Sequence, residues 1–381
     1  MNCQKHLFSI DPEVTYLNCA YMSPLMDSVV EAGIKGIKRK QHPWGVKGED
    51  FFDESNELRN EFAKLINTPE PNRCVIIPSV SYGLANVANN LKLSEDDEIL
   101  VVSEQFPSNV YPWRKIAEES RARIITITPP QTTENRTKLW NDYILNAITP
   151  KTKLVACAHI HWADGALFDL VSIREKTKEV GALLVVDGTQ SLGALPFDVH
   201  RIKPDALIAA GYKSLMGPYS IGMAYYSEAF DSGTPIEENW INRYKSEDFA
   251  NLVNYSDDYQ PQALRYEVGE HSNFILVPMM LEALKILNSW GTESVKTYCD
   301  DLVREPITKL RKAGFVIEKE GARASNLFGI RLGAHHNMNE IKQKLVSFNI
   351  FVSYRGDAIR VSPNVYNDSK DLATLVQALT E

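Results

Sequence analysis

Two short apolar runs, each followed closely by polar residues, constrain the fold more than any other feature of this sequence. Residues 183–186 lead directly into Asp187, and residues 206–210 end shortly before Lys213. Fully apolar runs of this length, closed by glycine and a polar residue, are typical of buried parallel strands. Because ligands of open α/β sheets bind at the carboxyl ends of the strands, the two runs predict an acid and an amine in one crevice.

The predicted crevice suggests a chemical use for Lys213. Burial lowers the pKa of an amine, and a neutral amine can form a Schiff base with an aldehyde. An acid such as Asp187 can keep the nitrogen of a pyridine ring protonated, so that the ring accepts electrons. A plainer interpretation is equally compatible with the spacing: Lys213 extends to solvent from a strand end, and Asp187 caps a helix.

Strand and helix patterns alternate through the first two thirds of the chain. Alternation at this pitch indicates βαβ units and a mainly parallel sheet, which gives the α/β fold class. The last strand follows its neighbour after a short Gly-Pro turn, which allows it to run antiparallel. The seven strands are expected at residues 74–77, 98–102, 124–127, 154–158, 183–186, 206–210 and 221–226.

The C-terminal part has a different pattern. A long helix at residues 273–290 is expected to bridge to a second domain of α+β architecture. We therefore expect a large domain over residues 15–275 and a smaller one over residues 276–381, joined by residues 1–14. The four strands of the small domain are expected near residues 315–319, 326–331, 351–353 and 358–362. The long irregular stretch between the last strand of the large sheet and the bridging helix predicts a lid or a subunit contact.

Two stretches of the sequence are characteristic of a known family. DGTQSLGALPFDV (187–199) and DALIAAGYKSLMGPYSIGMAYY (205–226) resemble the cofactor signature of class V aminotransferases. This group has the aspartate aminotransferase-like fold, fold type I, and includes cysteine desulfurases, kynureninases and isopenicillin N epimerase. The resemblance implies pyridoxal 5'-phosphate as cofactor, Lys213 as its Schiff-base lysine, Asp187 as partner of the ring nitrogen, and Gln190 as donor to the ring's phenolic oxygen.

Further residues would hold this cofactor. The turn at residues 78–83 joins a strand to a helix, where free N–H groups and the helix dipole favour a phosphate, although a plain serine N-cap explains the same residues. The resemblance places the phosphate on the Val80 backbone and Ser81, within reach of the Tyr212 phenol. It also implies that Phe106 stacks on the pyridine ring, whereas spacing alone favours a core phenylalanine.

The substrate contacts are expected on both domains. Arg360 lies inside an apolar strand and needs an anion, which its planar fork would bind in bidentate fashion. The resemblance implies the α-carboxylate of a small amino acid substrate, with an internal salt bridge as the alternative. Trp162, His161 and Tyr21 are expected to line the substrate pocket. His159 and His161 lack a third ligand, so no metal is predicted.

The same resemblance predicts a homodimer. The segment at residues 265–273 resembles one that reaches the neighbouring subunit's phosphate, but Glu270 replaces the usual threonine. A carboxylate would repel a phosphate, so this role is assigned to Ser272 or Asn273. The aromatic-rich irregular stretch at residues 239–259 is typical of an interface.

The reaction is less constrained than the cofactor. Cysteine desulfurases need a mobile cysteine on a loop between two arginine-bearing stretches, but only residues 356–359 separate Arg355 from Arg360. Without that nucleophile, we expect a transaminase or an epimerase-like enzyme rather than a standard cysteine desulfurase. A kynureninase-like reaction, C–S lyase β-elimination and a non-catalytic protein that binds the cofactor are the alternatives.

Composition argues against nucleic-acid-binding, secreted and membrane-spanning proteins. A net charge of −8 without a concentrated basic block argues against nucleic acid as a partner. The five widely spaced cysteines are typical of a reducing compartment. The sequence has neither a signal-peptide pattern nor an apolar run of about 18 residues, so we expect a cytoplasmic protein without a membrane span.

Overall fold

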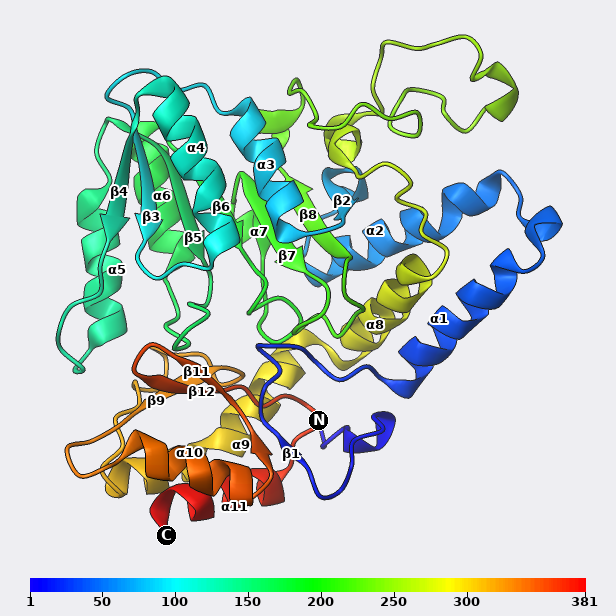
Figure 1. Cartoon of the computed structure of the whole chain (residues 1–381). Coiled ribbons are helices and arrows are strands. Elements are labelled where there is room, and N and C mark those ends of the chain that lie inside the picture. Colours follow the sequence, from blue (N-terminus) through cyan, green and yellow to red (C-terminus); the bar gives the residue numbers. More distant parts are fainter.

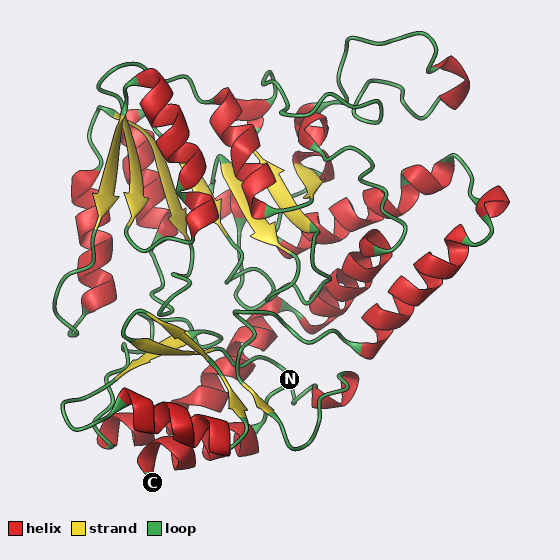
Figure 2. Cartoon of the chain, viewed as in Figure 1, coloured by secondary structure: helices red, strands yellow, loops and turns green.

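A computed structural model describes residues 1–381, and its centre is a seven-stranded sheet (Figures 1 and 2). The strand order is β2-β8-β7-β6-β5-β3-β4, in which β8 runs antiparallel to both neighbours and all other neighbours are parallel. The expected α/β fold class is therefore confirmed. The strands are β2 (Cys74–Ile77), β3 (Glu98–Val102), β4 (Arg123–Ile127), β5 (Thr152–Ala158), β6 (Leu183–Asp187), β7 (Ala206–Ala210) and β8 (Gly222–Tyr226).

Burial on both faces explains why the inner strands are largely apolar, whereas the edge strand β4 keeps exposed positions. Alternate side chains of a strand point to opposite faces, and in β2 the side chains of Cys74 and Ile76 enter one core while Val75 and Ile77 enter the other. The two cores lie under helices on either side of the sheet (Figure 1). The connecting helices are α3 (Val80–Asn90), α4 (Tyr111–Ser120), α5 (Arg136–Ala147), α6 (Leu170–Val180) and α7 (Val199–Ile202).

Three further helices flank the sheet on the side of β2. They are α1 (Asp27–Lys40), α2 (Asp53–Leu65) and α8 (Leu276–Trp290), and α8 packs against both of the others (Figure 1). Buried side chains of α8 such as Met280 and Leu284 belong to the larger core of the main sheet. This helix was expected to begin the small domain. The structure instead packs it with the large one, because its apolar side chains complete that core.

The C-terminal part forms a small domain with its own core. Its sheet has the antiparallel order β11-β12-β9, and β1 pairs in parallel with β10. The elements are β1 (Thr15–Tyr16), α9 (Thr292–Lys312), β9 (Phe328–Arg331), α10 (Met338–Ser347), β10 (Ile350–Phe351), β11 (Ser353–Arg355), β12 (Ala358–Val361) and α11 (Ser369–Thr380).

The small domain differs from expectation at two places. The strand expected at residues 315–319 is reduced to one bridge between Val316 and Arg331. The pairing of β1 with β10 places residues 15–16 beside the small domain, although they were expected to open the large one.

The remaining connections are irregular. In Figure 1 the stretch between β8 and α8 extends away from the sheet at the upper right, beyond α2. No helix of the chain has both the length and the apolar character needed to cross a bilayer. Short 3₁₀ turns occur at Lys5–Leu7, Pro43–Gly45, Glu49–Phe51, Pro71–Arg73, Pro107–Asn109, Glu228–Phe230, Phe249–Asn251 and Gln262–Tyr266.

Candidate active site

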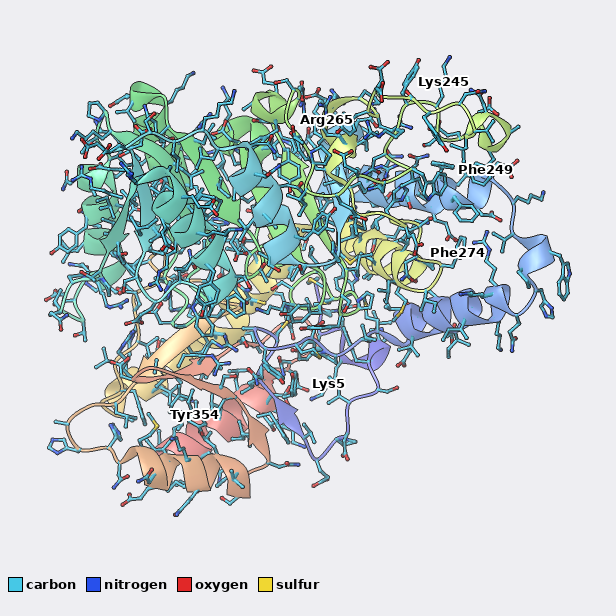
Figure 3. The ribbon with its side chains drawn as sticks, turned by 45° about the horizontal axis from the view of Figure 1, so that its top comes forward. Lys5, Lys245, Phe249, Arg265, Phe274 and Tyr354 are labelled. Atoms are coloured by element: carbon cyan, nitrogen blue, oxygen red, sulfur yellow. The ribbon has the colours of Figure 1, made fainter.

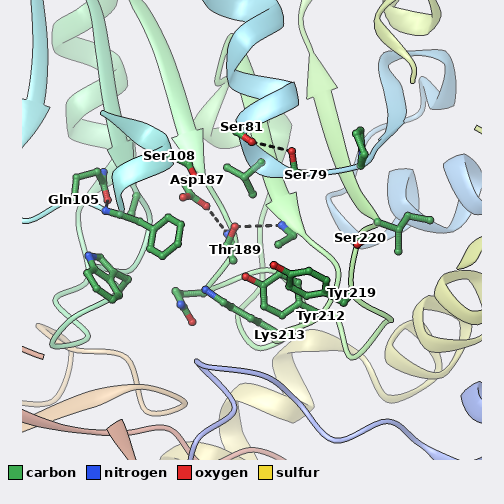
Figure 4. A pocket seen from close by; sticks show the side chains of 18 of the residues that line it. Ser79, Ser81, Gln105, Ser108, Asp187, Thr189, Tyr212, Lys213, Tyr219 and Ser220 are labelled. Atoms are coloured by element: carbon green, nitrogen blue, oxygen red, sulfur yellow. Dashed lines mark hydrogen bonds between the residues drawn. The ribbon is translucent and has the colours of Figure 1, made fainter. Parts of the chain in front are cut away.

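A cavity of about 320 Å³ lies at the carboxyl ends of the central strands (Figure 4). Apart from the antiparallel β8, the strand arrows of the main sheet in Figure 2 point towards the small domain, so this edge of the sheet faces it. The cavity is large enough for a small cofactor and substrate. Eight of the predicted site residues line it: Val80, Ser81, Phe106, Trp162, Asp187, Gln190, Tyr212 and Lys213.

Lys213 is a buried amine without a partner. Its Nζ makes no hydrogen bond or ion pair, and it lies 5.2 Å from the ring centroid of Phe106 and 5.5 Å from that of Tyr212. Burial is the main reason that the pKa of Lys213 is lowered to about 8, although the negative charge of Asp187 opposes the shift. A lysine with this pKa is partly neutral near physiological pH.

A tight backbone turn presents this lysine. The N–H of Gly211 donates to Ile221 O at 2.9 Å, and the N–H of Gly217 donates to Gly211 O at 2.9 Å. A Cβ on Gly211 would lie 2.6 Å from Ile221 O. Only glycine lets the chain leave β7 at this close approach.

Asp187 ends β6 and is held by the residues that follow it. Its Oδ1 accepts a hydrogen bond from Thr189 N at 2.9 Å, and Thr189 Oγ1 accepts one from Ala210 N at 3.2 Å, as dashed in Figure 4. These two bonds tie the end of β6 to the end of β7. Burial raises the pKa of Asp187. Thr189 was not among the predicted site residues, although an aspartate side chain that bonds the backbone two residues on is a known turn signal.

The first turn of α3 offers an anion site. Ser79 caps the helix by accepting a hydrogen bond from Tyr82 N at 3.2 Å, and its hydroxyl lies 2.9 Å from that of Ser81. The N–H groups of Val80 and Ser81 have no intrahelical acceptor, as is usual in a first turn. They point with the helix dipole towards the cavity end, which favours a phosphate.

Arg360 approaches the cavity from the small domain. Its guanidinium is buried and donates from Nη1 to Trp162 O at 3.0 Å and from Nη2 to Ser353 Oγ at 3.2 Å. It forms no ion pair, so the expected alternative of an internal salt bridge is not realised. Burial lowers the pKa of Arg360 to about 10. Arg360 Cζ lies 5.9 Å from the ring centroid of Trp162, which lines the cavity, although Arg360 is not itself among the lining residues.

His161 was expected in the substrate pocket, and the structure contradicts this. Its ring is fully buried, with Nδ1 3.2 Å from Asp164 Oδ1 and Nε2 3.3 Å from Ser103 O. Neighbouring side chains of an extended segment point to opposite sides, so His161 faces the interior because Trp162 faces the cavity. No group of three or more histidine, cysteine or acidic side chains is placed to hold a metal ion.

Three other predicted residues lie outside the cavity of their own chain. Tyr21 is 57% exposed and does not reach it. Ser272 and Asn273 are absent from its lining as well. Asn273 Oδ1 accepts hydrogen bonds from Ile275 N and Leu276 N at 3.0 and 2.9 Å, which commits that oxygen to the start of α8. The role expected of Ser272 or Asn273 in a partner's site stays a prediction.

The free groups in the cavity fit pyridoxal phosphate. An amine without a partner, a carboxylate and an anion-binding helix terminus face the same space. Gln190 adds an amide oxygen that is buried without a hydrogen-bond partner, while its Nε2 donates to Ala20 O at 3.2 Å. Buried polar atoms are almost always paired, so this orphan oxygen indicates a bound group that donates a hydrogen bond. The donation expected from Gln190 to the phenolic oxygen is not set up in this arrangement, because its Nε2 already donates to Ala20 O.

Comparison with known proteins supports this assignment. The sequence is 28% identical over 337 residues to the uncharacterized aminotransferase YcbU of Bacillus subtilis, covering 86% of this chain and 84% of that protein. It is 24% identical over 406 aligned positions to a probable cysteine desulfurase of Staphylococcus epidermidis. This match covers 99% of this chain and 92% of that protein.

Solved structures show the same fold. The complex between the cystine C-S lyase C-DES and its product cysteine persulfide superposes with a TM-score of 0.85 at 20% identity, covering 97% of this chain and 98% of that one. The cysteine desulfurase CsdA of Escherichia coli superposes with a TM-score of 0.81 at 20% identity, and the match covers 98% of this chain and 96% of that one. Residues 34–374 match the family described as Aminotransferase class-V. With its sheet, its lysine and its cofactor cavity, the chain belongs to the class V aminotransferase family of pyridoxal-phosphate enzymes.

Proposed function

We propose that the protein is an enzyme that acts at the α-carbon of a small amino acid, with transamination as its reaction. The observation that carries the proposal is the buried amine of Lys213, which has a lowered pKa and no partner in the cavity. Bound pyridoxal phosphate supplies an aldehyde and a ring that withdraws electrons from the substrate's α-carbon. A neutral amine beside that carbon can accept its proton.

The other residues prepare this proton transfer. Asp187 can hold a proton at the cofactor's ring nitrogen, because a buried carboxylate stabilises a nearby positive charge. Arg360 can bind the α-carboxylate and so orient the bond that breaks. Phe106 and Trp162 meet edge to face, with ring centroids 5.4 Å apart, and exclude water from this side of the cavity.

The number of bases favours transamination over epimerisation. The ionisable residues that line the cavity are Asp187, Tyr212, Lys213 and Tyr219. Burial raises the pKa of Tyr212, so its phenol stays protonated. Lys213 is thus the one strong base in the cavity near neutral pH. Two-base epimerisation needs one base on each face of the α-carbon. Transamination needs only one base, because a single amine can move the proton from the α-carbon to a second atom on the same face.

The cysteines support the expectation that this is not a standard cysteine desulfurase. None of the five lines the cavity. Cys19 is near enough to influence the pKa of Lys213. Its Sγ accepts a hydrogen bond from Asn364 at 3.5 Å, which favours the thiolate, but burial is the larger effect and raises the pKa of the thiol. A thiol held protonated in this way is a poor nucleophile. β-Elimination by a C–S lyase needs no enzyme cysteine, which keeps it as the second candidate.

Product analysis separates these reactions. We expect the holoenzyme, given single amino acids and a 2-oxo acid acceptor, to transfer the amino group without releasing ammonia. Omitting the acceptor should then stop the reaction after one turnover. Ammonia with pyruvate released from cysteine or cystine, independent of an acceptor, would instead identify the lyase. Alanine formed together with enzyme-bound persulfide would contradict both candidates.

We also propose that the protein forms a homodimer. The first observation that supports this is a row of exposed apolar side chains on α1. Val30, Ile34 and Ile37 are 41, 45 and 54% exposed and lie on one face of this helix. Trp44, in the turn that follows, is 82% exposed. A row of apolar side chains left in water is typical of a surface that another protein covers.

An aromatic cluster continues this surface towards Ser272. Phe51 contacts Phe249 and Phe274 edge to face, at centroid distances of 5.6 and 5.3 Å, and Trp240 contacts Phe249 at 5.5 Å. Figure 3 labels Phe249 and Phe274 on this side of the molecule. Aromatic side chains with a polar rim are typical of interfaces. The position of Ser272 near this cluster supports a role for its hydroxyl in the partner's phosphate site.

Charged substitutions on α1 test the dimer. We expect Ile34→Asp combined with Ile37→Asp to convert the protein to monomers in light scattering and to weaken cofactor binding, because each interface residue acts twice in a symmetric pair. Val346→Asp, on an apolar residue of the small domain that is 77% exposed, is the control and should stay dimeric. A wild-type monomer with full turnover would contradict a shared site.

A further inference from the structure

Two guanidinium groups of the β11–β12 hairpin converge on one side chain of the cavity. The strand register sets Ser353 opposite Arg360 and Arg355 opposite Ala358, which places Arg355 and Arg360 on the same face of the sheet. Their Cζ atoms lie 5.2 and 5.9 Å from the centroid of the Trp162 indole. Both positive charges therefore lie against the wall of the substrate space.

The indole that both arginines approach is held by two contacts of its own. Trp162 Nε1 donates to Glu104 O at 2.6 Å, and its ring meets Phe106 edge to face on the cavity side. Its backbone carbonyl accepts from Arg360 at 3.0 Å. The two arginines are thus anchored relative to the cavity by the residue that lines it.

Neither arginine is neutralised by the protein. No carboxylate lies within 4.0 Å of either group, because Asp357 of the hairpin pairs with Arg331 at 3.1 Å instead. A guanidinium has five N–H donors, of which the structure pairs two in Arg360 and one in Arg355. The Nε atoms of both are buried without an acceptor. Arg360 is buried and Arg355 half-buried. Buried charge without a counter-charge is costly, so the unpaired donors indicate anions that come with the ligand.

The positive charges of Arg355 and Arg360 both act on Lys213 in the cavity. Both arginines lower the pKa of Lys213, and Arg355 lowers that of Arg360. One carboxylate would compensate only one of the two guanidinium groups. An amino acid with a single carboxylate therefore leaves a positive charge beside the indole, and a second carboxylate would neutralise it.

We propose that the substrate is an acidic amino acid, whose α-carboxylate binds Arg360 while its side-chain carboxylate binds Arg355. The proposal rests on the amino acid chemistry proposed above and narrows its substrate class. Arg355 acts as a specificity residue, since it would contact the part of the substrate that does not react. The alternative, that both arginines share one α-carboxylate, predicts no preference for acidic ligands.

Binding of unreactive acids tests the proposal without turnover. Succinate and butyrate have the same number of carbon atoms and lack an amino group, so calorimetry on the holoenzyme compares two carboxylates with one. We expect succinate to bind about 10- to 100-fold more tightly, as a charge-assisted hydrogen bond allows. Arg355→Met should remove this preference and Arg355→Lys should restore part of it. Arg304→Met, at an exposed arginine of α9, is the control and should keep it.

The outcomes distinguish this inference from the proposed function. Equal affinities in the wild type, or a succinate preference that survives Arg355→Met, would overturn the inference. A loss of affinity for both acids in Arg355→Met would show a shared carboxylate and overturn it too. Cofactor absorbance and thermal unfolding show whether a variant is folded. If no amino acid is turned over but succinate is still preferred, the reaction proposed above fails and the two-arginine site stands.

Discussion

Replacement of Lys213 by alanine is expected to abolish turnover and leave the fold intact. The side chain is the one strong base near neutral pH in the cavity, so its loss removes the group that can move a proton at the α-carbon. General-base catalysis alone is worth roughly 10²- to 10⁴-fold, and loss of the covalent anchor adds to this. Steady-state rates with the preferred amino acid measure the effect.

The fold should tolerate this change because the amine has no partner to lose. A buried amine without a hydrogen bond costs free energy, so the midpoint of thermal unfolding of the cofactor-free protein should not fall. Lys115→Ala, at an exposed lysine of α4, is the matched control and should keep full activity. A Lys213→Ala enzyme that turns over at nearly the wild-type rate would rule out the proposed mechanism.

The lowered pKa of Lys213 gives a pH dependence for the same residue. The neutral amine is the form that reacts with an aldehyde, and burial lowers the pKa of Lys213 from 10.5 to about 8. Its neutral fraction therefore rises with pH and reaches one half near pH 8. Cofactor uptake by stripped wild-type enzyme should accelerate with the same midpoint. A midpoint near that of an exposed lysine would contradict the burial of this amine.

The centre of the sheet could be predicted because its strands are buried on both faces. Such strands are apolar up to their closing residues, as in β6, which ends in Asp187, and β7, which Gly211 follows. Their carboxyl ends then determined where Asp187 and Lys213 lie, and both line the same cavity. The strands of the small domain were harder to predict from the sequence, because they are short. The segment at residues 315–319 buries Phe315 and Ile317 as a strand would, but its backbone forms only one bridge.

The missed site residues depend on geometry that the sequence does not contain. His161 points away from the cavity because side chains alternate beyond β5, and the fold turns Ala158, Ile160 and Trp162 towards the cavity. Arg355 reaches Trp162 only because the hairpin register sets it on the same face as Arg360. Ser272 and Asn273 were assigned to a partner's site, and a single chain cannot place them there. Local pattern therefore predicted the cofactor cavity better than it predicted the substrate contacts.

Replacement of Asp187 is expected to cost about 10²- to 10³-fold in turnover, by analogy with the loss of one electrostatic group aimed at developing charge. The carboxylate would hold a proton at the cofactor's ring nitrogen, and without it the ring withdraws electrons less strongly. The cofactor should remain bound, since Lys213 and the first turn of α3 are unchanged. Its absorbance after gel filtration checks this point.

The choice of substitution separates an electrostatic role of Asp187 from a structural one. Asp187→Asn keeps a side-chain oxygen that can accept from Thr189 N, the bond that helps tie β6 to β7, but it carries no charge. Asp187→Ala loses both the bond and the charge. If the charge matters, the two variants should lose similar amounts of activity while only the alanine variant loses thermal stability. An asparagine variant with nearly wild-type turnover would show that Asp187 only supports the turn, and the ring nitrogen would then need another partner.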